Sequence, residues 1–77
     1  MILKYSITIN LIPTGNTIYL YSDIDLLARI HVAMENQKDF VYIFGFYESS
    51  GIAKSKQEFL INLSQIASIQ QIKKEDE

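Results

Sequence analysis

The sequence predicts a small α+β protein, in which a mainly antiparallel sheet of four or five strands carries one helix on one face. Residues 4–11 alternate apolar and polar side chains, as half-buried strands do. Residues 24–36 repeat apolar side chains every three or four positions, as helices do. Residues 40–47 are apolar on both faces of an expected strand. A chain of 77 residues has room for one domain, which we expect over 1–72, followed by a charged tail at 73–77.

The first two strands are expected to form a hairpin. In the first strand, one face is apolar, formed by Tyr5, Ile7, Ile9 and Leu11. Residues 13–16 then supply proline, glycine and asparagine, which favour a turn. In the second strand, at 17–21, Ile18 and Leu20 are expected to point inward.

The helix is expected to start at Ser22, whose hydroxyl can accept a hydrogen bond from an early backbone N–H. Asp23 and Asp25 would lie at the positive end of the helix dipole. Val32 is placed on the side opposite the apolar stripe, where it suits a contact surface. The stripe itself consists of Leu26, Leu27, Ile30, Ala33 and Met34.

The later strands are less regular. Gly45 interrupts the strand at 40–47 and indicates a bulge or strong curvature. A turn is expected at 49–51, a mobile loop at 52–57 and a fourth strand at 58–63. For 64–72, isoleucine content favours a tight turn and a last strand, and a C-terminal helix is the alternative. The expected core is Tyr5, Ile7, Ile9, Leu11, Ile18, Leu20, Leu27, Ile30, Met34, Ile43, Ile61 and Leu63.

Composition narrows the classes of function. The chain has no cysteine, which excludes disulfides and thiolate chemistry and is typical, in so small a domain, of a reducing compartment. Neither a signal peptide nor an apolar run of membrane-spanning length is seen, so we expect a cytoplasmic protein that does not bind membranes. Seven Lys and Arg against nine Asp and Glu give a net charge of −2, which disfavours nucleic acid as a partner.

No complete catalytic, metal-binding or cofactor-binding motif is found. His31 is the single histidine, and with Glu35 one turn later it cannot complete a zinc site. Asp23 and Asp25 already have a structural role at the helix start. Residues 51–55 lack the first glycine of a phosphate-binding loop. We therefore expect a non-enzymatic protein with no cofactor and no metal.

Two partial resemblances to known families were found. Residues 38–44 resemble the strand signature of RNA-recognition motifs, whose exposed aromatic side chains stack on bases. Asp39 and Val41 replace its small residues, Gly45 stands at its last aromatic position, and that fold places a helix after its first strand. The positions that fit are Lys38, Phe40, Tyr42 and Ile43.

The second resemblance concerns the order of elements. A hairpin followed by a helix, with the turn residues Thr14-Gly15-Asn16-Thr17-Ile18, is similar to the ubiquitin-type β-grasp over residues 1–36. The sequence closes on Lys73-Lys74-Glu75-Asp76-Glu77 and not on Gly-Gly, so conjugation as a modifier is not expected.

The surplus apolar face of residues 40–47 predicts a surface for protein contact, because one helix covers only one face of a sheet. We expect a partner protein, a second copy of the chain or both, and a role as adaptor or inhibitor, for example one encoded by a phage or mobile element. The expected contact residues are Tyr19, Tyr21, Val32, Phe40, Tyr42, Phe44, Phe46 and Tyr47. The alternative is binding of single-stranded nucleic acid, with phosphates contacted by Lys54, Lys56, Lys73 and Lys74.

Overall fold

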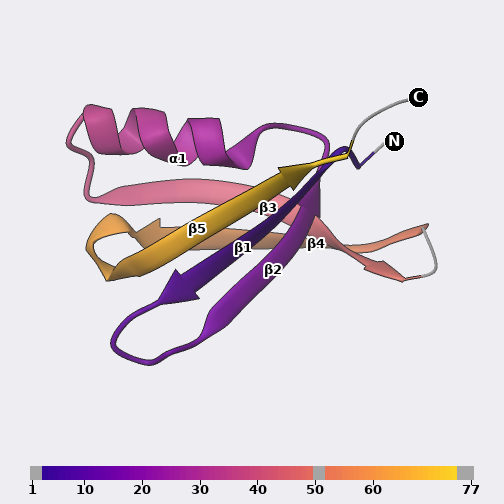
Figure 1. Cartoon of the computed structure of the whole chain (residues 1–77), viewed down its shortest axis with the longest axis horizontal. Helices are drawn as coiled ribbons and strands as arrows, with labels where there is room; N and C mark the ends of the chain where they lie inside the picture. Colours follow the sequence, from indigo (N-terminus) through magenta and orange to yellow (C-terminus); the bar gives the residue numbers. More distant parts are fainter. Residues whose placement is uncertain (1–2, 50–51, 75–77) are drawn as a thin grey trace.

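The computed structural model describes residues 3–49 and 52–74, which form one helix and one five-stranded antiparallel sheet (Figure 1). The strand order is β4-β3-β2-β1-β5, which confirms the predicted α+β class. The elements, in chain order, are β1 (Tyr5–Leu11), β2 (Thr17–Ser22), α1 (Leu26–Glu35), β3 (Phe40–Ser49), β4 (Ile52–Asn62), the short 3-10 helix η1 (Leu63–Gln65) and β5 (Ile66–Lys73).

Strands β1 and β2 form the predicted hairpin. They pair from Tyr5 opposite Ser22 to Asn10 opposite Thr17. In the turn between them, Gly15 has a φ of 78°, a left-handed conformation that glycine adopts without a Cβ clash.

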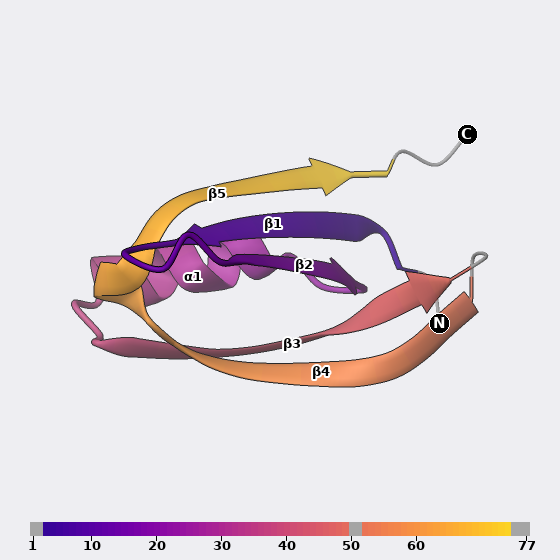
Figure 2. The same cartoon turned by 90° about the horizontal axis from the view of Figure 1, so that it is seen from below.

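The sheet curls because of a short connection. Strands β4 and β5 are consecutive along the chain but lie at opposite edges of the sheet, and only η1 joins them. The two edges must therefore approach each other at that end. Figure 2 shows the result, with β1, β2 and β5 on one side of the molecule and β3 and β4 on the other. Strands β2 and β3 pair at Tyr21 and Phe46, where the two halves of the sheet join.

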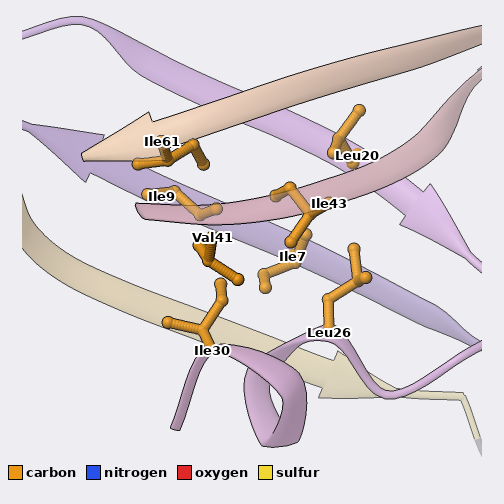
Figure 3. Close-up of a cluster of buried hydrophobic side chains, with 8 residues drawn as sticks. All are labelled: Ile7, Ile9, Leu20, Leu26, Ile30, Val41, Ile43 and Ile61. Atoms are coloured by element: carbon orange, nitrogen blue, oxygen red, sulfur yellow. The ribbon is translucent and has the colours of Figure 1, made fainter. Parts of the chain in front are cut away.

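The core fills the space between these two halves and α1 (Figure 3). Its eight buried side chains are Ile7, Ile9, Leu20, Leu26, Ile30, Val41, Ile43 and Ile61. Six of them were predicted, and four further predicted residues are partly buried: Tyr5, Leu11, Ile18 and Leu63.

Two predicted core residues are exposed instead. The side chains of Leu27 and Met34 are 38% and 42% exposed, whereas Leu26 is fully buried. The prediction placed Leu27, Ile30 and Met34 of the apolar stripe in the core and left Leu26 out. In the structure the sheet covers only the side of the stripe that contains Leu26 and Ile30.

The predicted cap of the helix is also wrong. Ser22 is still part of β2, and its buried hydroxyl accepts a hydrogen bond of 3.1 Å from the Ile24 N–H. Asp25 is the N-cap, because its carboxylate accepts a hydrogen bond of 2.9 Å from the Ala28 N–H. The strand continues one residue past Tyr21, so the helix begins later than the sequence pattern indicates.

Gly45 is not the predicted bulge, because it pairs with Gln57 within the regular part of the β3–β4 ladder. A Cβ atom at this position would lie 2.8 Å from the Tyr21 carbonyl oxygen and 3.0 Å from the Leu20 Cβ. Glycine is therefore required because β2 passes close to β3 here. The register irregularity of the β3–β4 pair lies farther along, between Tyr47 and Glu48.

The loop predicted at 52–57 is wrong as well, because β4 begins at Ile52 and pairs with β3 from Ser49 opposite Ile52 onward. Lysine, serine and glutamine in this segment do not resemble a strand, and the ladder to β3 determines its structure. Of the turn predicted at 49–51, residues 50 and 51 lie outside the described residues.

The last strand confirms the favoured interpretation of residues 64–72. After η1 the chain forms β5, which pairs antiparallel with β1. The strand includes Lys73, and the Lys74 N–H donates a hydrogen bond of 2.7 Å to the Lys4 carbonyl oxygen. The first part of the predicted tail thus belongs to the sheet, and residues 75–77 lie outside the described residues.

Candidate protein-contact surface

The two faces of β3 differ in their surroundings, and the apolar pattern of residues 40–47 does not show which of them meets the helix. Val41 and Ile43 point toward the core and are 7% and 0% exposed. Successive side chains of a strand alternate between faces. The even-numbered aromatic residues therefore lie on the outer face, where Phe40 is 52% and Tyr42 is 44% exposed, and Phe44 and Phe46 are half-buried.

Leu60 extends this row onto β4 and was missed by the sequence analysis. It lies opposite Tyr42 in the ladder and, at 70%, is the most exposed of the large apolar side chains described. The alternation of Phe59 and Ile61 on the inner face could have revealed it, because Leu60 must then point outward. We call the set Phe40, Tyr42, Phe44, Phe46 and Leu60 the aromatic surface.

Lys56 and Glu58, on the same face of the hairpin, form a closed circuit of contacts with Tyr42 and Phe44 of this surface. The Tyr42 hydroxyl donates a hydrogen bond of 2.6 Å to the Glu58 carboxylate, and Glu58 Oε1 lies 4.0 Å from Lys56 Nζ. Lys56 Nζ lies 4.6 Å from the centre of the Phe44 ring, a cation–π distance. The Phe44 and Tyr42 rings are 6.1 Å apart and tilted by 37°. These contacts hold the rings in place although water can reach them.

The circuit also affects proton binding. The hydrogen bond that Tyr42 donates to Glu58 raises the pKa of the Tyr42 hydroxyl, with smaller contributions from desolvation and from the negative charge of Glu58. A carboxylate acceptor stabilises the protonated phenol over the phenolate.

The other predicted contact residues lie at different distances from the aromatic surface. Tyr21 is 38% exposed and adjoins it, because it pairs with Phe46. Tyr19 is 63% exposed on β2 but pairs with Thr8 of β1, on the other half of the sheet. Tyr47, 47% exposed, alternates onto the opposite face of β3 from Phe46.

Val32 is 53% exposed on α1 and does not belong to the sheet face at all. The structure thus brings together five of the eight predicted residues, namely Tyr21, Phe40, Tyr42, Phe44 and Phe46.

The lysines of the nucleic-acid alternative are not gathered around the aromatic surface. Lys56 lies over the Phe44 ring of this surface, but Lys73 is on β5, at the opposite edge of the sheet from β4. Lys74 follows β5, and the side chain of Lys54 lies outside the described part of the chain.

The residues considered for catalysis are on the surface of α1. His31 Nδ1 lies 3.9 Å from Glu35 Oε1, and both side chains are about two-thirds exposed, at 69% and 64%. Asp25 is the helix cap described above, and Asp23 is exposed before the helix. In residues 3–49 and 52–74, no three His, Asp or Glu side chains are close enough together to hold a metal ion.

Comparison with known proteins yields no relative. No family model, no curated protein and no solved structure matches the chain. Among the described residues, no helix is long and apolar enough to cross a membrane.

Proposed function

We propose that this chain is a non-enzymatic protein that acts by protein–protein contact through the aromatic surface. The observation that supports the proposal is the exposure of large apolar side chains in one row of the β3–β4 hairpin, with Phe40, Tyr42 and Leu60 between 44% and 70% exposed. A contiguous apolar patch of this kind typically marks an interaction site in a small protein. Aromatic residues are also enriched at the centres of such interfaces.

The circuit favours a contact of defined geometry. Aromatic rings held by neighbours lose little conformational freedom on binding, and that lowers the entropic cost of association. Lys56 and Glu58 place one charge of each sign at the margin, which suits a polar rim around an apolar centre. Self-association and binding of a different protein both fit this surface, in the role of adaptor or inhibitor. We further propose that the contact is made in the cytoplasm, on the ground that the chain has no cysteine.

The proposal is tested with Leu60→Lys. A lysine at this exposed position leaves the core intact but places a charge on the aromatic surface, opposite Tyr42. We expect the wild-type protein at tens of micromolar to elute above its monomer mass of 8.9 kDa in size-exclusion chromatography with light scattering, or to retain a partner from a lysate. Leu60→Lys is expected to lose that association while keeping the wild-type melting temperature.

The matched control is Val32→Lys, at a position 53% exposed on α1, away from the sheet face. It should associate like the wild-type protein. A wild-type chain that is monomeric and retains nothing, or an equal loss of association in both variants, contradicts the proposal.

Binding of single-stranded nucleic acid is the second candidate, because Lys56 and exposed aromatic rings share one sheet face. It predicts affinity for oligo-U or oligo-T that falls as salt is raised. Absence of binding at low salt rejects it.

A further inference from the structure

A second surface lies between α1 and β5 and shares no residue with the aromatic surface. It is a groove of about 410 Å³ that runs along the helix. Its polar residues are Asp25, His31 and Gln71, and its apolar residues are Leu27, Ala28, Ile30, Met34 and Ile69.

The helix has more apolar surface here than the sheet covers. Leu27, Ile30 and Met34 are three and four residues apart and so lie along one face of α1. Ile30 is fully buried, whereas Leu27 and Met34 are 38% and 42% exposed. β5 is the last strand of the sheet on this side, so no strand in the described part of the chain lies beneath these two side chains. One more strand, about 4.8 Å beyond β5, would lie at the open side of the groove.

The backbone of β5 is oriented to accept such a strand. The Lys74 N–H donates to the Lys4 carbonyl oxygen beside β1, so Lys74 directs its backbone groups toward that neighbour. In a strand, alternate residues direct their N–H and C=O groups to opposite sides. The backbone groups of Ile69, Gln71 and Lys73 therefore point to the outer edge, where no strand of the described chain pairs with them.

The two edges of the sheet differ in how they resist added strands. The edge strand β4 carries Lys56 and Glu58, and its pairing with β3 is irregular between Tyr47 and Glu48. Charged side chains and irregular pairing are the usual protection of an edge strand. Strand β5 has no proline and no charged residue from Ile66 to Ile72, and its pairing with β1 is irregular only at its start, between Asn10 and Leu11 of β1. The stretch from Ile69 to Ile72 therefore lacks this protection.

The negative charge of Asp25 in the groove limits which partner can bind there. Asp25 is the single carboxylate that lines it, and no lysine or arginine lines it, although the charge of Lys73 at the end of β5 also acts on this carboxylate. Gln71 donates a hydrogen bond of 2.8 Å to the Asp25 carboxylate, and its amide oxygen accepts one of 2.9 Å from the Leu27 N–H. The bond from Gln71, followed by that from the Ala28 N–H, lowers the pKa of Asp25, so the carboxylate is charged at neutral pH. A cation in the occupant would complement it.

We propose that an extended segment of a partner protein binds in this groove and adds to β5 as a sixth, antiparallel strand. Its alternate apolar side chains contact Leu27 and Met34, and a lysine or arginine near its N-terminal end faces Asp25. This end is specified because an antiparallel segment begins beside the C-terminal end of β5, where Gln71 holds Asp25.

A second copy of β5 fits less well in the same place. In antiparallel pairing its N-terminal residues would lie beside Asp25, and Ile66, Ala67 and Ser68 provide no positive charge there. This is why we assign the groove to a different protein.

The probe for the test is a synthetic peptide of eight residues, with lysine first, valine at its third, fifth and seventh positions and threonine between them. We expect its addition to isotope-labelled protein to shift the amide NMR signals of Ile69, Gln71 and Lys73 and of the groove side of α1. Two further peptides carry N-methyl groups on alternate residues, one on its odd-numbered residues and the other on its even-numbered residues. Because only alternate N–H groups face β5, one set of N-methyl groups should abolish binding and the other should leave it within about twofold.

Variants of the protein test the side-chain contacts. Met34→Glu should weaken peptide binding by about tenfold, since it introduces a charge into the apolar groove. Val32→Glu is the matched control, because Val32 is exposed on the same helix but does not line the groove. Asp25→Asn keeps a side chain that caps helices, so the helix should persist while the preference for lysine over glutamate at the first peptide position disappears.

Several results would overturn the proposal. They are no signal shift at millimolar peptide, shifts confined to the aromatic surface, equal binding of both N-methylated peptides, and β5 shifts that follow protein concentration without peptide. The last result would assign the edge to a second copy of the chain. A failure of this test leaves the association assay with Leu60→Lys unaffected, so the two proposals are tested separately.

Discussion

At the scale of single residues, Gly45 lies where the neighbouring strand leaves no room for a side chain. A Cβ here would lie 2.8 Å from the Tyr21 carbonyl oxygen, and backbone atoms cannot move away as a flexible side chain can. We predict that Gly45→Ala destabilises the protein by about 1–3 kcal/mol in urea unfolding, the usual cost of overpacking. Gly15→Asn is the control, because Gly15 has open space around it and asparagine tolerates a positive φ. A loss below about 0.5 kcal/mol for Gly45→Ala would show that β2 and β3 can separate there.

Tyr42 gives a pH-dependent prediction. Its pKa is raised above the ordinary value of 10.0 by the hydrogen bond to Glu58. A group whose pKa rises on folding stabilises the protein below its unfolded pKa, and this contribution is lost as pH rises through the folded value. We therefore predict that Glu58→Gln lowers the pKa of Tyr42 toward 10.0 and leaves the other tyrosines unchanged. NMR titration of the tyrosine ring carbons measures each group, with Glu35→Gln as the control. An unchanged Tyr42 titration in Glu58→Gln would contradict the assignment of the hydrogen bond.

At the scale of elements, periodicity predicts those segments in which one face meets the core and the other meets water. Strand β1 is such a segment, and its alternation predicts both the strand and its buried face. The same reasoning fails for β4, where residues 54–58 are polar and are held by pairing with the long strand β3. Pairing partners far apart along the chain cannot be read from a local pattern.

The contact surface, too, could be predicted only in part from local sequence patterns. The double apolar pattern of β3 predicts an exposed aromatic face, but only the packing of Val41 and Ile43 in the core decides which of its two faces is exposed. Leu60 was missed because its exposure follows from pairing opposite Tyr42. The exposed side of α1 was also missed, since periodicity defines the stripe and only the position of β5 decides how much of it is buried.

At the scale of the whole molecule, the chain divides its apolar side chains between a thin core and two exposed surfaces. Eight side chains form the buried cluster, and many large apolar side chains outside it are exposed, among them Leu60, Tyr19 and Met34. Small domains bury only about 60% of the surface of the unfolded chain, so their net stability is small. An apolar side chain that is exposed for binding does not add to the core, and the core of so small a domain contains few such side chains.

This distribution predicts different effects for two substitutions on the two faces of the β3–β4 hairpin, one on stability and one on association. Ile43→Ala removes part of a fully buried side chain from the centre of the core and should cost about 2–5 kcal/mol, a large fraction of the stability of a domain this small. Leu60→Ala, at a position 70% exposed, should change the free energy of unfolding by less than about 0.5 kcal/mol but reduce association. Urea unfolding together with light scattering measures both quantities. A loss of stability in Leu60→Ala that approaches that of Ile43→Ala would mean that the aromatic surface is part of the folding core and not a surface held available for a partner.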